Sequence, residues 1–369
     1  MCRDGGSKSK VKRDEQATRV SVQAQAAGAE RTGGRGGAAV EHAGTGRVYE
    51  RRGLAGGVVN WLLHTREVPL IAIILVTALV MTGLSPYFLT PANLTAMLIG
   101  LAPTAIIAVG MAILLVSGGF DLSVGAVLAL SGTVVGLLLI QGVNPWLAVL
   151  MVLLMAAGIG LVNGLLVTKI RVNPLIATLG TMSAARGIAL VLTEGYSVSG
   201  LPPSFGYIGS ESILGVPYIV VIMLVIVLVG DLALRHTLYL RQAYFIGSNE
   251  TAARLSGISV DRVKISTYVL TAVLAGLSGV LLTSRLMAGT PTAATGLELQ
   301  VLAAAVIGGA SLAGGEGTVL GAFLGVLFVG MISNAMTMLA VSIYWQMVVT
   351  GAILIAAVAL DMLARRRRG

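Results

Sequence analysis

Apolar runs separated by short polar segments fill the chain from Val68 onward. A helix needs about 20 predominantly apolar residues to cross a bilayer, and ten stretches approach that length. They are residues 68–84, 95–116, 122–140, 145–168, 172–193, 215–234, 264–285, 298–313, 317–340 and 343–363. This pattern predicts an all-α integral membrane protein, a polytopic bundle of eight to ten transmembrane helices, with ten as the favoured count.

The fifth and eighth of these stretches fit a continuous helix least well. The fifth contains Pro174 and Arg186, and both contain glycines. Breaks at proline and glycine are tolerated in a membrane where neighbouring protein groups satisfy the freed backbone. We therefore expect these two stretches to be broken or re-entrant.

Basic residues mark one side of the membrane. With ten spans and an internal amino terminus, fourteen Lys and Arg residues fall in cytoplasmic segments and only Arg285 falls on the exterior side. The fourteen are Arg51, Arg52, Arg66, Lys169, Arg171, Arg235, Arg241, Arg254, Arg262, Lys264 and Arg365 to Arg368. Because cytoplasmic loops carry an excess of Lys and Arg, both termini are predicted to be cytoplasmic.

The amino-terminal region has a different composition. Residues 1–55 are rich in Gly, Ala, Ser, Arg and Lys and poor in large apolar side chains. Such a segment buries too little surface to offset its ordering entropy, and no apolar run follows its early basic residues, as a signal peptide would require. We predict a disordered basic cytoplasmic tail over 1–65 and a membrane domain over 66–369. The tail is an unstructured extension, an overcalled start, or a contact for anionic lipid headgroups.

Composition agrees with a membrane chain. The 369 residues are 56% hydrophobic and 11% charged, against roughly 25% charged residues in soluble domains. The 48 glycines suit close helix packing, and three pairs spaced by four residues are candidates: Gly132/Gly136, Gly160/Gly164 and Gly321/Gly325. The single Cys2 and three scattered histidines exclude a disulfide framework and a zinc site.

Catalytic chemistry is not indicated. The chain has no Gly-x-x-x-x-Gly-Lys-Ser/Thr phosphate loop, so it is not expected to hydrolyse ATP or to bind a cofactor. The glycine-rich run over 308–317 lacks the lysine of such a loop and joins two predicted spans. A tight turn between short helices is the better interpretation, and the chain is predicted to be no enzyme.

Few ionisable residues lie within or beside the apolar stretches. Asp121 and Ser123 stand where the third span begins, where either side chain can cap the helix. Arg186 lies inside the fifth stretch and needs a carboxylate, carbonyl groups or a water-filled cavity. Glu298 opens the eighth stretch, where a negative charge suits a helix amino terminus. A proton-coupled carrier usually needs ionisable groups at mid-membrane, so this placement disfavours one.

Four blocks of sequence carry a family likeness. They are Gly118–Gly125, Asn173–Gly187, Ile246–Ile258 and Ala303–Leu312. With these blocks in this order, residues 66–363 resemble the membrane-spanning permease subunit of bacterial ABC-type sugar importers, the ribose, xylose, arabinose and galactose group.

The resemblance implies a fold and a set of partners. The expected fold is a helical permease domain of the cobalamin-importer-like type, paired with a second copy or a homologue in the bacterial inner membrane. A separate cytoplasmic subunit would bind ATP and Mg²⁺ and supply the energy. A periplasmic or lipid-anchored binding protein would deliver the sugar, and no nucleic acid is involved.

Within the cytoplasmic loop 235–263, the resemblance implies a coupling segment that docks on the ATPase. Its candidate residues are Gly247, Asn249, Glu250, Thr251, Ala252, Ala253, Arg254 and Gly257. A short helix at such a turn can pass a rigid-body movement to the attached spans. Related permeases have Glu-Ala-Ala followed four residues later by Gly, whereas Thr251 occupies the acidic position here.

The substrate path is expected between two permease copies. Its candidates are Asn93, Thr95, Asp121, Ser123, Asn173, Thr178, Thr181, Arg186, Glu298 and Asn334, and each can equally satisfy backbone groups at a helix break. The nearest alternative function is a branched-chain amino-acid permease of the same architecture. A stand-alone carrier or channel would need its own ion site or filter, and a receptor or scaffold would need a folded extramembrane domain.

Overall fold

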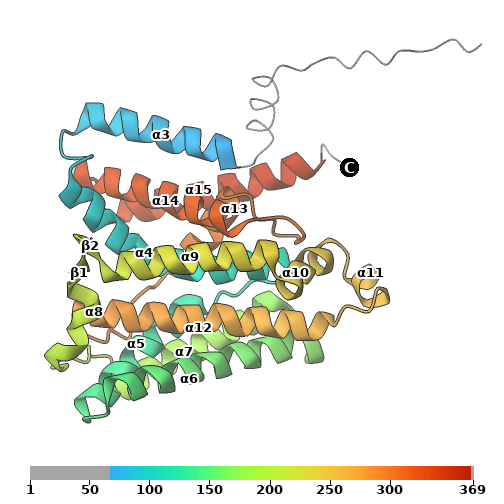
Figure 1. Ribbon diagram of the computed structural model, residues 1–369, viewed down its shortest axis with the longest axis horizontal. Helices are drawn as coiled ribbons and strands as arrows, with labels where there is room; N and C mark the ends of the chain where they lie inside the picture. Colours follow the sequence, from blue (N-terminus) through green and yellow to red (C-terminus); the bar gives the residue numbers. More distant parts are fainter. Residues whose placement is uncertain (1–66, 367–369) are drawn as a thin grey trace, which may run out of the picture. The chain divides into compact units, whose positions relative to one another are not determined.

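The computed structural model describes residues 67–366, and helices dominate this part of the chain (Figure 1). The tail predicted over 1–65, with Arg51, Arg52 and Arg66, lies outside the described residues. The elements are α3 (Glu67–Leu84), α4 (Pro91–Val116), α5 (Val124–Ile140), α6 (Pro145–Leu165), a π-helical turn η1 (Leu166–Ile170), α7 (Pro174–Thr193), η2 (Pro203–Gly206), α8 (Tyr207–Ser210), β1 (Ser212–Ile213), β2 (Val216–Pro217), α9 (Tyr218–His236), α10 (Leu238–Ser248), α11 (Glu250–Leu255), α12 (Val260–Leu286), α13 (Leu297–Ile307), α14 (Val319–Met338) and α15 (Ile343–Arg366).

Each of the ten predicted stretches overlaps one α-helix of the structure. Seven helices are long and apolar enough to cross a membrane, and α5, α13 and the apolar part of α15 are shorter. The prediction of a mostly helical, polytopic membrane protein is therefore confirmed, whereas the count of ten crossings stays a prediction. The two-residue strands β1 and β2 form a small antiparallel hairpin that the pattern did not predict.

The expectation of a broken fifth stretch was wrong. Helix α7 runs from Pro174 to Thr193 without a break, and the side chain of Asn173 accepts a hydrogen bond from the Leu175 N–H at its start. Proline is favoured at the first helical position because the N–H it lacks would have no intrahelical partner there. The eighth stretch is indeed broken: α13 ends at Ile307, and non-helical backbone continues to Thr318.

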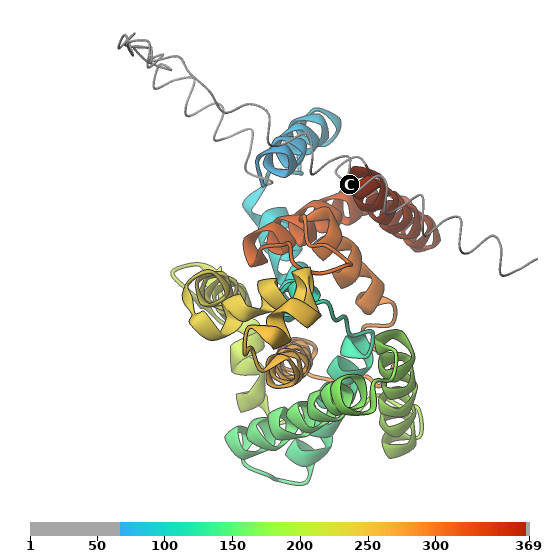
Figure 2. The ribbon, with the colours of Figure 1, turned by 90° about the vertical axis from the view of Figure 1, so that its right-hand side faces the viewer.

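Helix α12 lies at the centre of the helices that pack through small residues, and it contacts α4, α5 and α6 (Figure 2). A Cβ added to Gly160 would lie 2.7 Å from the Tyr268 carbonyl oxygen, and one on Gly164 would lie 2.9 Å from the Ile265 Cα. A Cβ on Gly279 would overlap the Leu128 carbonyl oxygen. Glycine therefore lets neighbouring backbones touch, as the apolar glycine pairs predict.

The pair in α14 packs in the same way, but one predicted position does not. A Cβ on Gly321 or Gly325 would overlap the carbonyl oxygen of Gly308 or Ala304, so α13 and α14 meet backbone to backbone. Gly136 instead faces the side chains of Val198 and Leu201, which lie in a loop.

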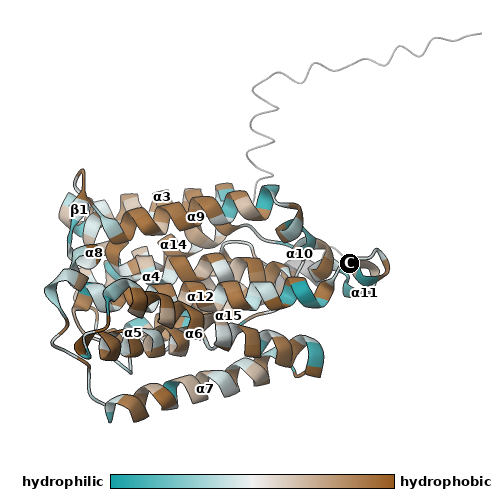
Figure 3. Ribbon diagram, turned by 60° about the horizontal axis from the view of Figure 1, so that its bottom comes forward, coloured by the Kyte–Doolittle hydropathy of each residue, from teal (hydrophilic) through white to brown (hydrophobic). Residues whose placement is uncertain are grey.

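The connecting segments divide between two ends of the helices. Helices α10 and α11 lie at one end, and α8 with the β1–β2 hairpin lies at the other (Figure 1). Apolar residues run along the helices, while hydrophilic residues gather towards their ends (Figure 3). Lys169 and Arg254, both assigned to the cytoplasm by charge, pair with Asp261 at the α10–α11 end.

Replacement of Gly279 tests the close packing of α12. Gly279→Ala places a methyl group on the Leu128 carbonyl oxygen, and overpacking of this kind typically costs about 1–3 kcal/mol. We expect the detergent-solubilised protein to lose its monodisperse form at a lower temperature than the unsubstituted chain. Gly158→Ala is the matched control, since a Cβ there meets nothing within 4 Å. Equal melting of the two variants would contradict the packing argument.

Candidate functional site

Local capping interactions define the short helix of the coupling segment, residues 247–258. The Asn249 side chain accepts a hydrogen bond of 3.0 Å from the Ala252 N–H and so begins α11, as a helix N-cap does. At the other end, the N–H groups of Gly257 and Ile258 donate to the carbonyls of Arg254 and Ala253, each at 3.0 Å. Gly257 has a φ of 82°, the left-handed conformation that glycine adopts after a helix in this motif.

An ion-pair network joins α11 to its neighbours. Lys264 Nζ lies 2.6 Å from Glu250 Oε2, and Arg254 Nη2 lies 2.9 Å from Glu250 Oε1 and 2.8 Å from Asp261 Oδ1. Lys169 of η1 reaches Asp261 at 2.8 Å. The hydrogen bond from Lys264 is the main cause that holds the pKa of Glu250 below its ordinary value. Exposed pairs contribute little stability singly, but this network orients α11 against α12.

The two faces of α11 differ. Ala253 is buried in an apolar cluster with Val116, Ala243, Ile246, Val260 and Val263. On the outward face, Thr251 and Ala252 are exposed, and Leu255 is 86% exposed although it is large and apolar. The outward face of α11 therefore presents Thr251, Ala252 and Leu255, whereas Ala253 packs against the rest of the chain.

Backbone contacts between glycines connect the coupling segment to the membrane helices. We call Gly118, Gly247, Gly314 and Gly315 the glycine junction. The Gly315 N–H donates to the Val116 carbonyl at 2.9 Å, and a Cβ on Gly247 would overlap both Val116 O and Gly315 N. A Cβ on Gly314 would lie 2.8 Å from Gly247 Cα and 2.9 Å from Gly118 Cα. The ends of α4 and α10 and the loop before α14 therefore meet without intervening side chains.

The glycine junction also brings distant motifs together. Two of the blocks that carry the family likeness, 118–125 and 246–258, meet the glycine run 308–317 there. The Tyr244 hydroxyl adds a hydrogen bond of 2.8 Å to the Gly317 carbonyl. Sequence reasoning assigned the run to a tight turn but did not predict that the coupling segment packs on it.

Asp121 and Ser123 belong to a buried polar cluster rather than a simple helix cap. Asp121 Oδ1 accepts from the Ser123 N–H at 2.7 Å and from its hydroxyl at 2.6 Å, and the Ser123 side chain makes no capping bond to α5. Asn163 donates to Asp121 Oδ2 at 3.3 Å, and the Thr181 hydroxyl donates to Asn163 Oδ1 at 2.5 Å. The cluster ties the α4–α5 loop to α6 and α7. Sequence reasoning missed Asn163, because a lone amide in an apolar run gives no spacing signal.

Arg186 and Glu298 support the non-helical segment that precedes α13. Arg186 Nη1 donates to the carbonyls of Pro291 at 2.9 Å and Ala293 at 2.7 Å. Glu298 Oε1 accepts from the Gly296 N–H at 3.2 Å. Arg186 is therefore paired with backbone carbonyls, one of the three kinds of partner expected for it. These non-helical carbonyls in turn have a hydrogen-bond donor within the protein, as a bilayer requires.

The remaining path candidates lie elsewhere. Asn93 and Asn334 exchange two amide hydrogen bonds, at 3.0 and 2.9 Å, between α4 and α14. The Thr178 hydroxyl donates to the Pro174 carbonyl of its own helix. The candidates therefore form separate clusters and not one site. Within residues 67–366, no three His, Cys, Asp or Glu side chains are grouped so that they could hold a metal ion.

Comparison with known proteins gives one family and several curated relatives. The model of the family described as branched-chain amino acid transport system / permease component matches residues 93–358. The ribose import permease protein RbsC of Escherichia coli (strain K12) is 42% identical over 305 residues, 82% of this chain and 94% of the relative. RbsC of Bacillus subtilis (strain 168) is 41% identical over 288 residues, 78% and 89% of the two chains. The D-allose transport system permease protein AlsC of Escherichia coli (strain K12) is 39% identical over 283 residues, 76% and 87%. No solved structure matches the chain.

Two glycine substitutions distinguish the role of the glycine junction from that of the α11 cap. Gly247→Ala forces Val116 O and Gly315 N apart, so we expect faster backbone hydrogen exchange at the end of α4 and in the 308–317 loop. Gly257→Ala has free space around the new methyl group and strains only its own positive φ, at a cost of about 1–2 kcal/mol. Its effect should stay within α11. Equal exchange patterns in the two variants would refute the junction as a mechanical contact.

Proposed function

Because this chain belongs to the family described as branched-chain amino acid transport system / permease component, we propose that it is the membrane-spanning subunit of an ATP-driven importer. Its solute is a monosaccharide or a similar polyhydroxy compound that moves from the exterior to the cytoplasm. The ribose and allose permeases that it matches over most of their length favour a sugar over a branched-chain amino acid.

The observation that carries the proposal is the attachment of the coupling segment to the glycine junction. Packed elements move as rigid bodies rather than deform continuously. A partner that pulls on α11 therefore moves the end of α4 and the loop before α14 with it, since Gly247 touches both through backbone atoms. The chain itself is a transport subunit without catalytic chemistry, and a separate subunit binds ATP and Mg²⁺.

Three partners complete the proposed importer. A cytoplasmic ATPase receives the outward face of α11, a periplasmic or lipid-anchored binding protein delivers the sugar at the opposite end, and a second permease copy or a homologue completes the path. The assembly lies in the bacterial inner membrane. The proposed fold is cobalamin-importer-like with ten crossings, made of the seven long apolar helices and the three shorter ones.

A substitution on the outward face of α11 tests the ATPase contact. Leu255 is the most exposed large apolar residue of the coupling segment, and burial of an unpaired carboxylate in its place against a partner is costly. Leu255→Asp should weaken copurification with the ATPase of the same locus at least about tenfold. ATP-dependent uptake of labelled sugar into vesicles should fall in parallel while the chain remains inserted.

The matched control is Leu214→Asp in the β1–β2 turn, at the end opposite α11, where the side chain is 99% exposed. It should copurify with the ATPase as the unsubstituted chain does. Ala253→Asp is unsuitable, because it would place a charge in the apolar cluster that holds α11. Sugar uptake that needs no ATPase would instead indicate a secondary carrier, and unchanged copurification of Leu255→Asp would place the docking site elsewhere.

A further inference from the structure

An apolar groove lies between α6, α9 and α12, at the end of the helices opposite α10 and α11. Helix α12 lies between α9 and α6, and α8 lies at the same end (Figure 1). The volume of the groove is about 570 Å³, within the roughly 300–1,000 Å³ of small-molecule sites. The distribution of Lys and Arg assigns this end to the exterior side of the membrane.

The lining of the groove changes from aromatic to aliphatic along the helices. Trp146 and Tyr218 stand at the outer ends of α6 and α9, and the ring centroids of Tyr207 and Tyr218 are 5.8 Å apart. About one helical turn further in, Val149 and Ile222 line the groove. Trp and Tyr gather where a membrane meets water, because one part of each side chain is apolar and another is polar. The groove therefore begins at the level of the lipid headgroups and continues into the hydrocarbon region.

Helix α12 supplies one wall of the groove. Leu277, Val280, Leu281 and Ser284 line it at helical spacing, and the Ser284 hydroxyl is already used, since it donates to the Phe205 carbonyl at 2.6 Å. At 1.5 Å per residue, this stretch of α12 spans about 10 Å along its axis. None of the described residues that line the groove is charged. A hydrocarbon chain suits such a space, because it leaves few polar groups buried without a partner.

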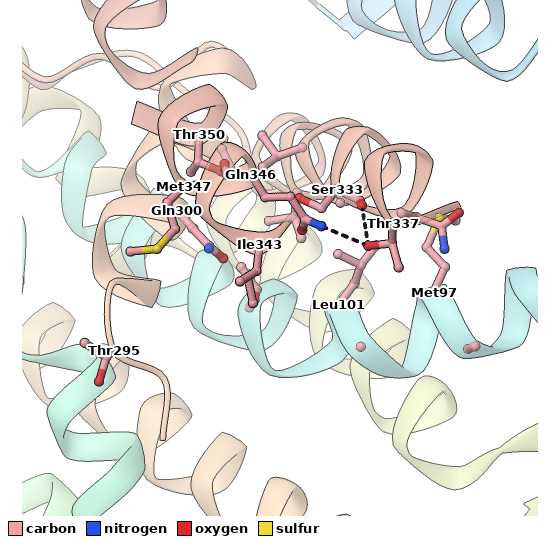
Figure 4. Close-up of a pocket in the computed structure, with 18 residues that line it drawn as sticks. Met97, Leu101, Thr295, Gln300, Ser333, Thr337, Ile343, Gln346, Met347 and Thr350 are labelled. Atoms are coloured by element: carbon pink, nitrogen blue, oxygen red, sulfur yellow. Dashed lines mark hydrogen bonds between the residues drawn. The ribbon is translucent and has the colours of Figure 1, made fainter. Parts of the chain in front are cut away.

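The cavity between α4, α13, α14 and α15 has a different lining (Figure 4). Gln300, Ser333, Thr337 and Gln346 line it, and Gln346 Nε2 donates to Thr337 Oγ1 at 3.2 Å. A hydrocarbon chain placed there would bury amide and hydroxyl groups against apolar surface, which is costly. Of these two cavities, the groove beside α12 is therefore the one that suits an acyl chain.

Arg285 supplies a positive charge beside the groove. It follows Ser284 of the lining and is exposed, and its Nη1 lies 3.5 Å from the Gly209 carbonyl oxygen in α8. A Cβ on Gly209 would lie 2.5 Å from the Arg285 N, so α8 packs directly on the end of α12. Arg285 forms no ion pair with a carboxylate of residues 67–366. A guanidinium with free N–H groups matches the geometry of a phosphate.

We propose that the groove binds one anionic phospholipid of the outer leaflet. One acyl chain lies along Val149, Leu277 and Leu281, and the phosphate accepts hydrogen bonds from the Arg285 guanidinium. The headgroup and the chain thus match two separate features of the site, and selective binding needs both. A lipid held there contacts α6, α9 and α12 together. The proposal does not depend on which solute the chain transports.

Quenching of Trp146 fluorescence by brominated lipids tests the site, because bromine quenches only nearby tryptophan. The other two tryptophans, Trp61 and Trp345, are replaced by Phe, and the full chain is reconstituted in phosphatidylcholine vesicles. Phosphatidylglycerol brominated on its acyl chains should bind about fivefold more tightly than brominated phosphatidylcholine, the equivalent of about 1 kcal/mol for one basic residue near a lipid surface.

Substitution of Arg285 tests the headgroup contact. Arg285→Gln should abolish the preference for phosphatidylglycerol, and Arg285→Lys should retain it, because an ammonium group also pairs with phosphate. The matched control is Arg241→Gln, which removes a positive charge from α10 at the opposite end of the helices. It should leave the quenching of Trp146 unchanged.

A larger side chain inside the groove tests the acyl chain separately. Val149→Phe takes up part of the groove while Arg285 remains, so we expect the preference for phosphatidylglycerol to be lost by steric exclusion. Val162→Phe is the matched control on the same helix, where the side chain is 51% exposed and lies outside the groove. It should keep the preference of the unsubstituted chain.

The outcomes decide the proposal. Loss of the lipid preference in Arg285→Gln and Val149→Phe, but in neither control, would support it. Equal quenching by the two brominated lipids in the unsubstituted chain would overturn it, because the groove would then hold only bulk lipid. An unchanged preference in Arg285→Gln would also overturn it, and a loss of affinity for the binding protein in its place would assign Arg285 to a protein carboxylate.

Discussion

Backbone polar groups inside a bilayer have no water to bond with, and this constraint organises the described part of the chain. It explains why helices dominate there and why the backbone at two of the breaks is bonded by distant residues. The carbonyls of Pro291 and Ala293, before α13, accept from Arg186. The Val116 carbonyl, past the end of α4's own ladder, accepts from Gly315. At these two breaks, distant segments of the chain are held together.

Glycine residues allow segments that are far apart in sequence to contact each other directly through their backbones. Where two backbones touch, as at Gly247 with Val116 and Gly315, no flexible side chain can absorb a displacement. The coupling segment combines this rigid inner contact with an exposed apolar outer residue, Leu255. An element that is rigidly attached on one face and open to a partner on the other is suited to transmitting movement. Backbone contacts of the same kind join α13 to α14 at Ala304–Gly325 and Gly308–Gly321.

Much of the architecture could be predicted from hydrophobic periodicity and charge, because lipid selects for long apolar helices and for basic residues on one side. The caps at Asn249 and Gly257 are also local, since each depends on residues within a few positions along the chain. The break in the fifth stretch was predicted wrongly, because Pro174 was treated as interrupting a helix that it begins. The inward orientation of Ala253 could not be predicted, because a six-residue helix carries too short a pattern to tell its buried face from its exposed one.

By itself, the sequence indicated an integral membrane protein, the positions of its helices, the uneven distribution of Lys and Arg among the loops, and the family likeness. All of these depend on composition or on residues close together along the chain. Only the tertiary structure decided that Asn163 completes the cluster around Asp121, that the glycine run 308–317 packs on Gly247, and that polar residues of α4, α13, α14 and α15 face one cavity. The physical reason is that each of these depends on contacts between helices far apart in sequence. A single polar residue or glycine in an apolar run does not indicate which helix it will meet.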